Sequence, residues 1–188
     1  MKKQILVATL FSLISGFANA HPGHGLVSTY AGFMHPLTGL DHLLVMLAVG
    51  VWAAKLGGPA RWQLPLTFII TMAFGALLGS IGLNFAGIET AIAASVMAMG
   101  VFLMLSLSMN KQAQLGIVAL FALLHGMAHG VVIDSQSNMA ALAGMLMATV
   151  ALHGIGYLMG AQRAVIFNLG NKLFAWLMLF VGSYLLVS

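Results

Sequence analysis

Histidine and aspartate occur together inside a long apolar stretch near the start of the chain. Residues 35 to 42 read HisProLeuThrGlyLeuAspHis, so His35, Asp41 and His42 lie within eight residues. Imidazole nitrogens and carboxylate oxygens both bind divalent transition metals. A carboxylate next to a histidine has a second use, because it can accept the proton of the ring and so orient it. We therefore interpret His35, Asp41 and His42 as candidate metal-binding residues, with Asp41 serving either as a ligand or as the orienting group.

A second group of histidines has helical spacing. His125 and His129 are four residues apart in HisGlyMetAlaHisGly, which places both on one helix face with Cβ atoms about 5 to 6 Å apart. Two imidazoles at this spacing can share one metal ion, as on zinc-binding helices. Gly126 and Gly130 beside them leave room for a neighbouring helix to supply further ligands. His153 is the last candidate inside an apolar stretch. A single buried histidine is also often a hydrogen-bonded structural residue, so both interpretations of His153 stay open.

Other potential ligands are weaker candidates. The sequence HisProGlyHisGly begins at residue 21, and a free amino-terminal histidine chelates a divalent ion through its amine and imidazole. His21 and His24 are therefore candidate capture residues, although a short tail can also carry histidines by chance. The chain has 14 methionines without a repeated motif, which indicates apolar packing. It has no cysteine, which excludes thiolate metal sites.

The composition identifies the kind of protein that must position these residues. Only 7 of the 188 residues are Lys or Arg and 3 are Asp or Glu, so 5% are charged, against roughly 25% in soluble domains. With 61% hydrophobic residues and a mean hydropathy of +1.05, the chain has too little polar surface for a soluble enzyme. Its basic residues are scattered and form no stripe that tracks phosphates, which argues against nucleic-acid binding. We expect a protein that is not an enzyme, because no paired acid and base stands out.

Residues 1–20 have the order of a secretory signal, with Lys2 and Lys3 first, an apolar stretch next and AlaAsnAla at the end. A retained first membrane helix is the alternative, but the apolar part has only about 13 residues and a spanning helix needs about 20. Residues 21–188 then form one domain, predicted as an all-α membrane protein with a bundle of six transmembrane helices. The expected spans are 26–54, 64–83, 88–108, 115–133, 139–159 and roughly 164–187, the last interrupted by Asn168, Asn171 and Lys172.

The basic residues indicate how these spans are oriented. If the mature amino terminus lies outside, three connections face the cytoplasm, and these hold or adjoin Lys55, Arg61, Lys111, Arg163 and Lys172. The other two connections hold no basic residue, and cytoplasmic connections carry such an excess of Lys and Arg. We expect a multi-pass protein of the bacterial inner membrane with a periplasmic mature amino terminus. Its expected partners are the lipid bilayer and a divalent transition-metal ion.

Local sequence also predicts how the histidines are arranged. Pro36 cannot donate a helical hydrogen bond but fits a first helical turn, so a break at Pro36 would place His35 at a helix start. Depth below the outer surface follows from a rise of about 1.5 Å per residue. The predicted order of increasing depth is His129, then His125 and His35, then His42 and His153. This order predicts a descending series of stations rather than one closed site, since conduction requires sites that also release the ion.

The chain resembles the HupE/UreJ family of small membrane proteins associated with hydrogenase and urease systems. The resemblance extends over essentially the whole chain, and the HisPro-x-x-Gly-x-AspHis motif is complete at residues 35–42. Family members commonly carry a glutamate shortly after HisGly-x-AlaHisGly, and Asp134 is the candidate replacement in this chain. The resemblance implies permeation of nickel or cobalt. The metal is then the substrate, and no resident cofactor is expected.

The resulting hypothesis is an inner-membrane permease that takes up Ni²⁺ or Co²⁺ from the periplasm through a path lined by histidine and aspartate. It would supply the maturation of a metalloenzyme. ATP hydrolysis is not expected, because the chain has no phosphate-cradling Gly-x4-Gly-Lys-Ser/Thr motif. Two alternatives stay open: a permease for another divalent metal such as Zn²⁺, and a membrane accessory factor that binds metal without transporting it. A membrane metalloenzyme, with the histidines as its catalytic centre, is a third and weaker alternative.

Overall fold

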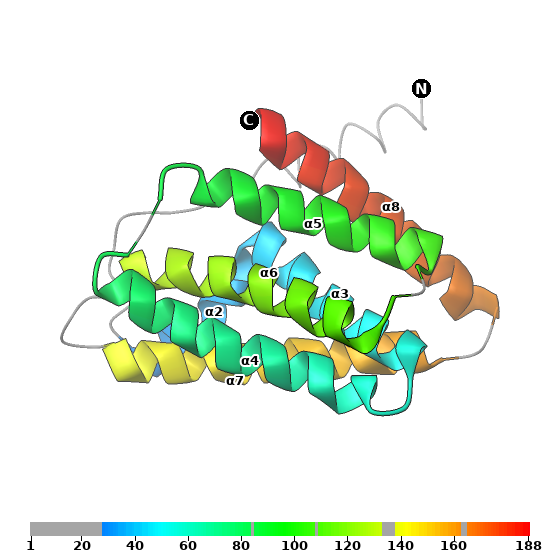
Figure 1. Cartoon of the computed structure of the whole chain (residues 1–188), viewed down its shortest axis with the longest axis horizontal. Helices are drawn as coiled ribbons and strands as arrows, with labels where there is room; N and C mark the ends of the chain where they lie inside the picture. The colour runs from blue at the N-terminus through cyan, green and yellow to red at the C-terminus, as the bar shows by residue number, and fades with distance from the viewer. Residues whose placement is uncertain (1–27, 84, 108, 133–137, 163–164) are drawn as a thin grey trace, which may run out of the picture.

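The computed structural model describes residues 28–83, 85–107, 109–132, 138–162 and 165–188. All regular secondary structure in these ranges is α-helical (Figure 1). The predicted signal sequence, His21, His24 and Asp134 lie outside the described residues. The helices are α2 (Thr29–Thr38), α3 (Leu40–Leu56), α4 (Ala60–Ser80), α5 (Ile88–Leu105), α6 (Lys111–Val132), α7 (Asn138–Ala161) and α8 (Val165–Val187).

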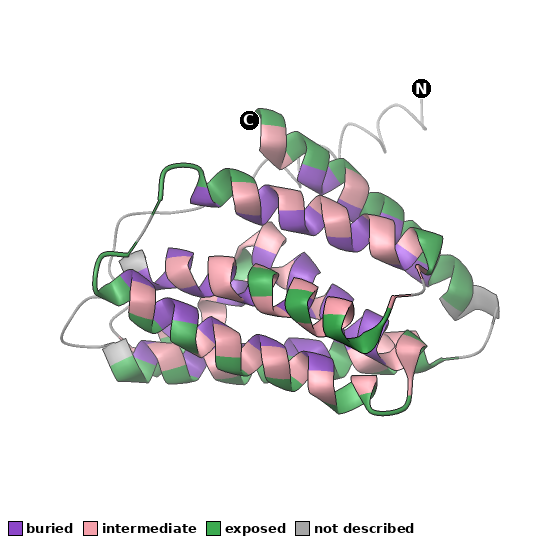
Figure 2. Ribbon diagram, in the orientation of Figure 1, coloured by how far each residue is buried: buried purple, intermediate pink, exposed green. Residues whose placement is uncertain are grey.

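Most of these helices are long and apolar enough to cross a bilayer. Five meet this description, namely α4, α5, α6, α7 and α8, and α2 with α3 would make a sixth span that is bent by 83°. Large apolar side chains face outward, as Phe74 and Trp176 illustrate with exposed fractions of 56% and 60%. Figure 2 shows exposed residues along the outer sides of α4 and α8. Such an exterior fits lipid rather than water, so the described part is that of a multi-pass membrane protein.

The first predicted span is broken at Gly39 and not at Pro36. Pro36 lies inside α2, which begins where the Ala31 amide donates a 3.1 Å hydrogen bond to the side chain of Ser28. Gly39 has an extended backbone, with φ −84° and ψ 116°. Its amide donates to the carbonyl of His35, and its own carbonyl accepts from Leu43, so one residue both closes α2 and opens α3. His35 therefore lies in the last turn of α2, and the prediction that it begins a helix is wrong.

Glycines set the closest contacts between helices. Gly75 and Gly79 of α4 lie against Gly126 and Gly130 of α6, as expected for small residues that pack a bundle. A second contact of this kind joins α3 to α7, because Cβ atoms built on Gly50 and Gly156 would overlap backbone atoms of the opposite helix. Gly32 of α2 and Gly144 of α7 make a third contact of the same kind, and α5 packs beside α8 (Figure 1).

The central helix is α3, which contacts α2, α4, α5, α7 and α8. Its residues from Leu44 to Ala53 are nearly all buried, and they form the middle of the apolar core. The last helix, α8, is continuous from Val165 to Val187. The prediction that polar residues near its start interrupt it is therefore wrong. Lys172 is exposed, whereas Asn171 is buried. The apolar core thus surrounds α3, whose first turn contains Asp41 and His42.

Candidate metal centre

Four histidine rings from three helices meet at the start of α3. The ring centroid of His42 lies 4.5 Å from that of His129, 5.0 Å from that of His125 and 5.6 Å from that of His35. The rings of His35 and His129 are 4.9 Å apart. These histidines form one cluster, which differs from the predicted series of separate stations at increasing depth. The bend at Gly39 is the reason, because it brings the end of α2 and the start of α3 together beside α6.

Three of the four histidines are arranged as a metal-binding group. His35, His42 and His129 each offer one ring nitrogen, and these nitrogens all lie within 4.8 Å of one another. Nitrogens bound to one ion at about 2.1 Å each lie at most about 4.2 Å apart. The rings therefore need to approach by only about 0.6 Å to hold a single ion. We call His35, His42, His125 and His129 the histidine cluster.

Asp41 lies on the ring of His42 rather than among the three nitrogens. Its Oδ1 lies 2.6 Å from Nδ1 of His42 and accepts the backbone N–H of the same residue at 2.8 Å. Because Nδ1–H donates this hydrogen bond to the carboxylate, the proton of the neutral ring is on Nδ1 and Nε2 keeps its lone pair. Of the two roles considered for Asp41, this geometry fits the orienting role. Gly39 makes room for the pair, since a Cβ at this position would lie 3.0 Å from Oδ1 and 3.2 Å from Nδ1.

Carbonyl contact orients a second ring. Nδ1 of His125 donates to the carbonyl of Phe121, one turn earlier on α6, at 2.8 Å. The Nε2 atoms of His42, His125 and His129 are all buried and find no hydrogen-bond partner among the described residues. A buried polar atom without a partner costs about 1 to 3 kcal/mol. Three such nitrogens in one cluster therefore favour a site that an external ligand completes.

Helix packing positions the cluster. A Cβ on Gly126 would overlap the carbonyl oxygen of Met72, and a Cβ on Gly130 would overlap that of Ala76. This close approach of α4 fixes the rotation of α6, which directs His125 and His129 toward α3. The helix that packs on these glycines supplies no histidine or carboxylate to the cluster, which corrects the expectation that it would add ligands. The candidate ligands that lie beside His125 and His129 are His35 on α2 and His42 on α3.

His153 lies apart from the cluster. It is buried on α7, and neither of its ring nitrogens finds a partner within the described ranges. Its ring packs perpendicular to that of Phe68 at a centroid distance of 5.0 Å, and the Phe68 ring also lies 6.1 Å from that of His125. Sequence reasoning missed Phe68, because an apolar residue in an apolar helix gives no signal. It also missed the carbonyl of Phe121, because any helical carbonyl is an equal candidate.

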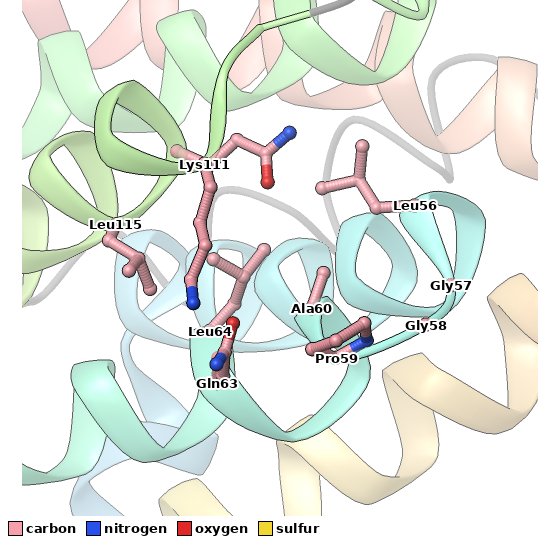
Figure 3. A pocket seen from close by; sticks show the side chains of 10 residues that line it. Leu56, Gly57, Gly58, Pro59, Ala60, Gln63, Leu64, Lys111 and Leu115 are labelled. Carbon is pink, nitrogen blue, oxygen red and sulfur yellow. The ribbon is translucent and has the colours of Figure 1, made fainter.

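A cavity of about 240 Å³ lies near the opposite end of α3 and is not the metal centre. Leu56, at its rim, is 14 residues after His42 on the same helix, which corresponds to about 20 Å. Figure 3 shows Lys111 reaching toward Gln63 across this cavity. Its lining includes no histidine and no carboxylate, so it lacks the ligands that the cluster has.

Comparisons with known proteins find the same family that the motif at residues 35–42 indicates. The family model described as "HupE / UreJ protein" matches residues 9–185. Protein HupE from Rhizobium leguminosarum bv. viciae is 39% identical over 165 residues, which cover 87% of this chain and 86% of that protein. No solved structure gives a significant match. With a family match over nearly the whole length and a relative at this identity, the chain belongs to the HupE/UreJ family.

Proposed function

We propose that the protein is an inner-membrane permease that takes up Ni²⁺ or Co²⁺ from the periplasm through a path lined by histidine and aspartate. The observation that carries the proposal is the histidine cluster inside a bundle of apolar helices, in which ring nitrogens of His35, His42 and His129 lie within 4.8 Å of one another. The buried Nε2 atoms of His42, His125 and His129 find no hydrogen-bond partner among the described residues. Buried ionisable groups in membrane helices are costly and commonly mark ion pathways. Membership of the HupE/UreJ family supports nickel or cobalt as the cargo and the maturation of a hydrogenase or urease as its use.

The ligand chemistry supports a borderline divalent metal. Imidazole nitrogens suit nickel, cobalt and zinc, whereas calcium and magnesium prefer oxygen ligands. Neutral imidazoles hold such an ion without adding charge, and Asp41 on the ring of His42 compensates part of the positive charge. A small set of neutral ligands also permits release, which conduction requires.

The path extends beyond the cluster in both directions. After cleavage of residues 1–20, His21 and His24 at the periplasmic amino terminus collect the ion and pass it to the histidine cluster. His153 then receives it on the way to the cytoplasm. The mature chain crosses the membrane six times, with α2 and α3 counted as one broken span. An inside-negative potential favours the entering divalent ion by about 4.6 kcal/mol per 100 mV, so no ATP hydrolysis is needed.

A binding factor without transport activity is the second candidate. The observation that favours it is the gathering of four histidines into one cluster, which resembles a binding site more than a series of stations. A permease for Zn²⁺ is a variant of the first candidate, because three nitrogens also suit zinc. Both candidates predict metal binding by the purified protein, and only a permease predicts flux.

Uptake into proteoliposomes tests the proposal. Radioactive nickel, cobalt or zinc is supplied outside in separate assays, with the unlabelled ions as competitors. The permease predicts uptake that His42→Ala and Asp41→Ala abolish and that Arg61→Gln, which removes an exposed charge at the start of α4, preserves. Metal binding without any flux would establish the accessory factor instead. Flux of zinc with none of nickel or cobalt would refute the proposed cargo.

A further inference from the structure

Phe68 links the histidine cluster to His153. Its ring is fully buried on α4, with an exposed fraction of 0%. It contacts the His125 ring at 6.1 Å and an angle of 55°, and the His153 ring at 5.0 Å and 88°. Ring contacts therefore run from His42 to His125, on to Phe68 and then to His153.

Phe68 is the member of this series that offers no ligand atom. His125 has a buried Nε2 without a partner, and His153 has two buried ring nitrogens without partners in the described part of the chain. A metal ion held at either histidine can exchange water for nitrogen. An ion beside the Phe68 ring would have neither a protein ligand nor water, because the ring provides no nitrogen or oxygen and excludes water.

Methionine side chains pack in the same core cluster as Phe68. Met72 lies one turn further along α4, and its sulfur is 3.8 Å from the Thr149 hydroxyl, which also lies 3.3 Å from the sulfur of Met46. Thr149 is itself one turn before His153 on α7. Methionine side chains are unbranched and adapt their shape easily, so they can fill the space that a rotating ring leaves.

We propose that Phe68 is an apolar gate that separates the histidine cluster from His153 and limits the rate at which metal passes between them. The inference rests on the proposed permease function and adds the residue that controls passage. With the ring in place, metal is held at the cluster. Rotation of the ring brings the two histidine sites into contact through water, and metal moves inward. Apolar constrictions that open in this way are an established means of gating ion paths.

The test compares binding and flux in variants of one residue. Phe68→Ala and Phe68→Leu are reconstituted in liposomes, with Phe74→Ala as the matched control, because Phe74 lies on the same helix and is 56% exposed. Nickel binding to the purified variants is measured by calorimetry, and downhill nickel flux is measured without a membrane potential. The gate predicts unchanged binding and faster flux, by about tenfold, which corresponds to a barrier lowered by about 1.4 kcal/mol. Phe74→Ala should behave as the unmodified protein.

Leucine is smaller than the phenylalanine ring and opens part of the space that the ring fills while the site stays apolar, so Phe68→Leu decides the outcome if the alanine variant does not fold. A folded Phe68→Leu variant whose flux is unchanged or slower would overturn the gate. The proposed permease would survive that result if the unmodified protein transports nickel and His42→Ala does not. Absence of flux from the unmodified protein, with metal binding intact, would overturn both proposals.

Discussion

Asp41 and His42 form a carboxylate–imidazole pair inside the described helical bundle, with 2.6 Å between Oδ1 and Nδ1. The His42 side chain is buried, with 4% exposure, and the Asp41 side chain is mostly buried, with 14%. The pair fixes the proton on Nδ1 and leaves the buried Nε2 of His42 as the atom that can bind a metal. Its effect on metal binding is open to direct measurement.

Replacing Asp41 by asparagine removes the charge while the side chain keeps its size. Metal affinity should fall by about 10- to 100-fold, as is typical when a carboxylate behind a metal-binding histidine is lost. Calorimetry with nickel and cobalt on the purified protein measures the change, and Arg61→Gln, which removes an exposed charge, is the control. Equal affinity of Asp41→Asn and the unmodified protein would show that the carboxylate neither binds nor orients.

Variants of the histidine cluster should lose metal affinity, whereas a variant of His153 should lose metal flux alone. His42→Ala and His129→Ala remove members of the three-nitrogen group, so affinity should fall at least as much as the roughly 10- to 100-fold typical of an orienting partner. His153→Ala leaves that group intact and should keep the affinity while lowering flux. The same purified variants serve for calorimetry and for proteoliposome uptake. A large loss of affinity in His153→Ala would place this residue in the binding site itself.

Alanine at Gly126 should disturb the packing that orients α6. The added methyl group would overlap the carbonyl oxygen of Met72, and overpacking of this kind costs about 1 to 3 kcal/mol. We expect a lower unfolding temperature in detergent and weaker nickel binding. Gly154→Ala is the control, because a Cβ there meets open space and alanine favours the helix. Equal unfolding temperatures of the two variants would contradict the assigned packing.

The absence of cysteine permits a direct test of orientation. Thr90 and Gln112 are exposed near the starts of α5 and α6, which lie at opposite ends of the spans in the proposed topology. A membrane-impermeant maleimide should label Thr90→Cys in intact spheroplasts and Gln112→Cys only after permeabilisation. Labelling in the opposite order would reverse the proposed orientation.

Sequence spacing alone predicted the parts of the site that lie on one helix. His125 and His129 share a face of α6 because residues four apart always do so on a helix. The membership of His42 in the same cluster depends on the rotation of α6 against α4, which glycine contacts set. That rotation involves residues far apart in the chain, such as Gly75 and Gly126, and local patterns do not determine it.

The break in the first span shows a second limit. Pro36 carries the stronger local signal, because it cannot donate a helical hydrogen bond. The helix nevertheless continues through it and ends at Gly39, where a side chain would crowd Asp41 and His42. The position of the break thus depends on a contact of the folded site. Phe68 illustrates the same limit, because only its neighbours distinguish it from other apolar residues.

The three nitrogens at the centre come from residues 35, 42 and 129, so a bound ion would join the first part of the chain to its middle. It would act as a cross-link that holds α2, α3 and α6 together and stabilises the folded bundle in proportion to its occupancy. Any motion that separates these helices must also break bonds to the ion. Release of the metal and separation of α2, α3 and α6 are therefore thermodynamically coupled, so that each favours the other.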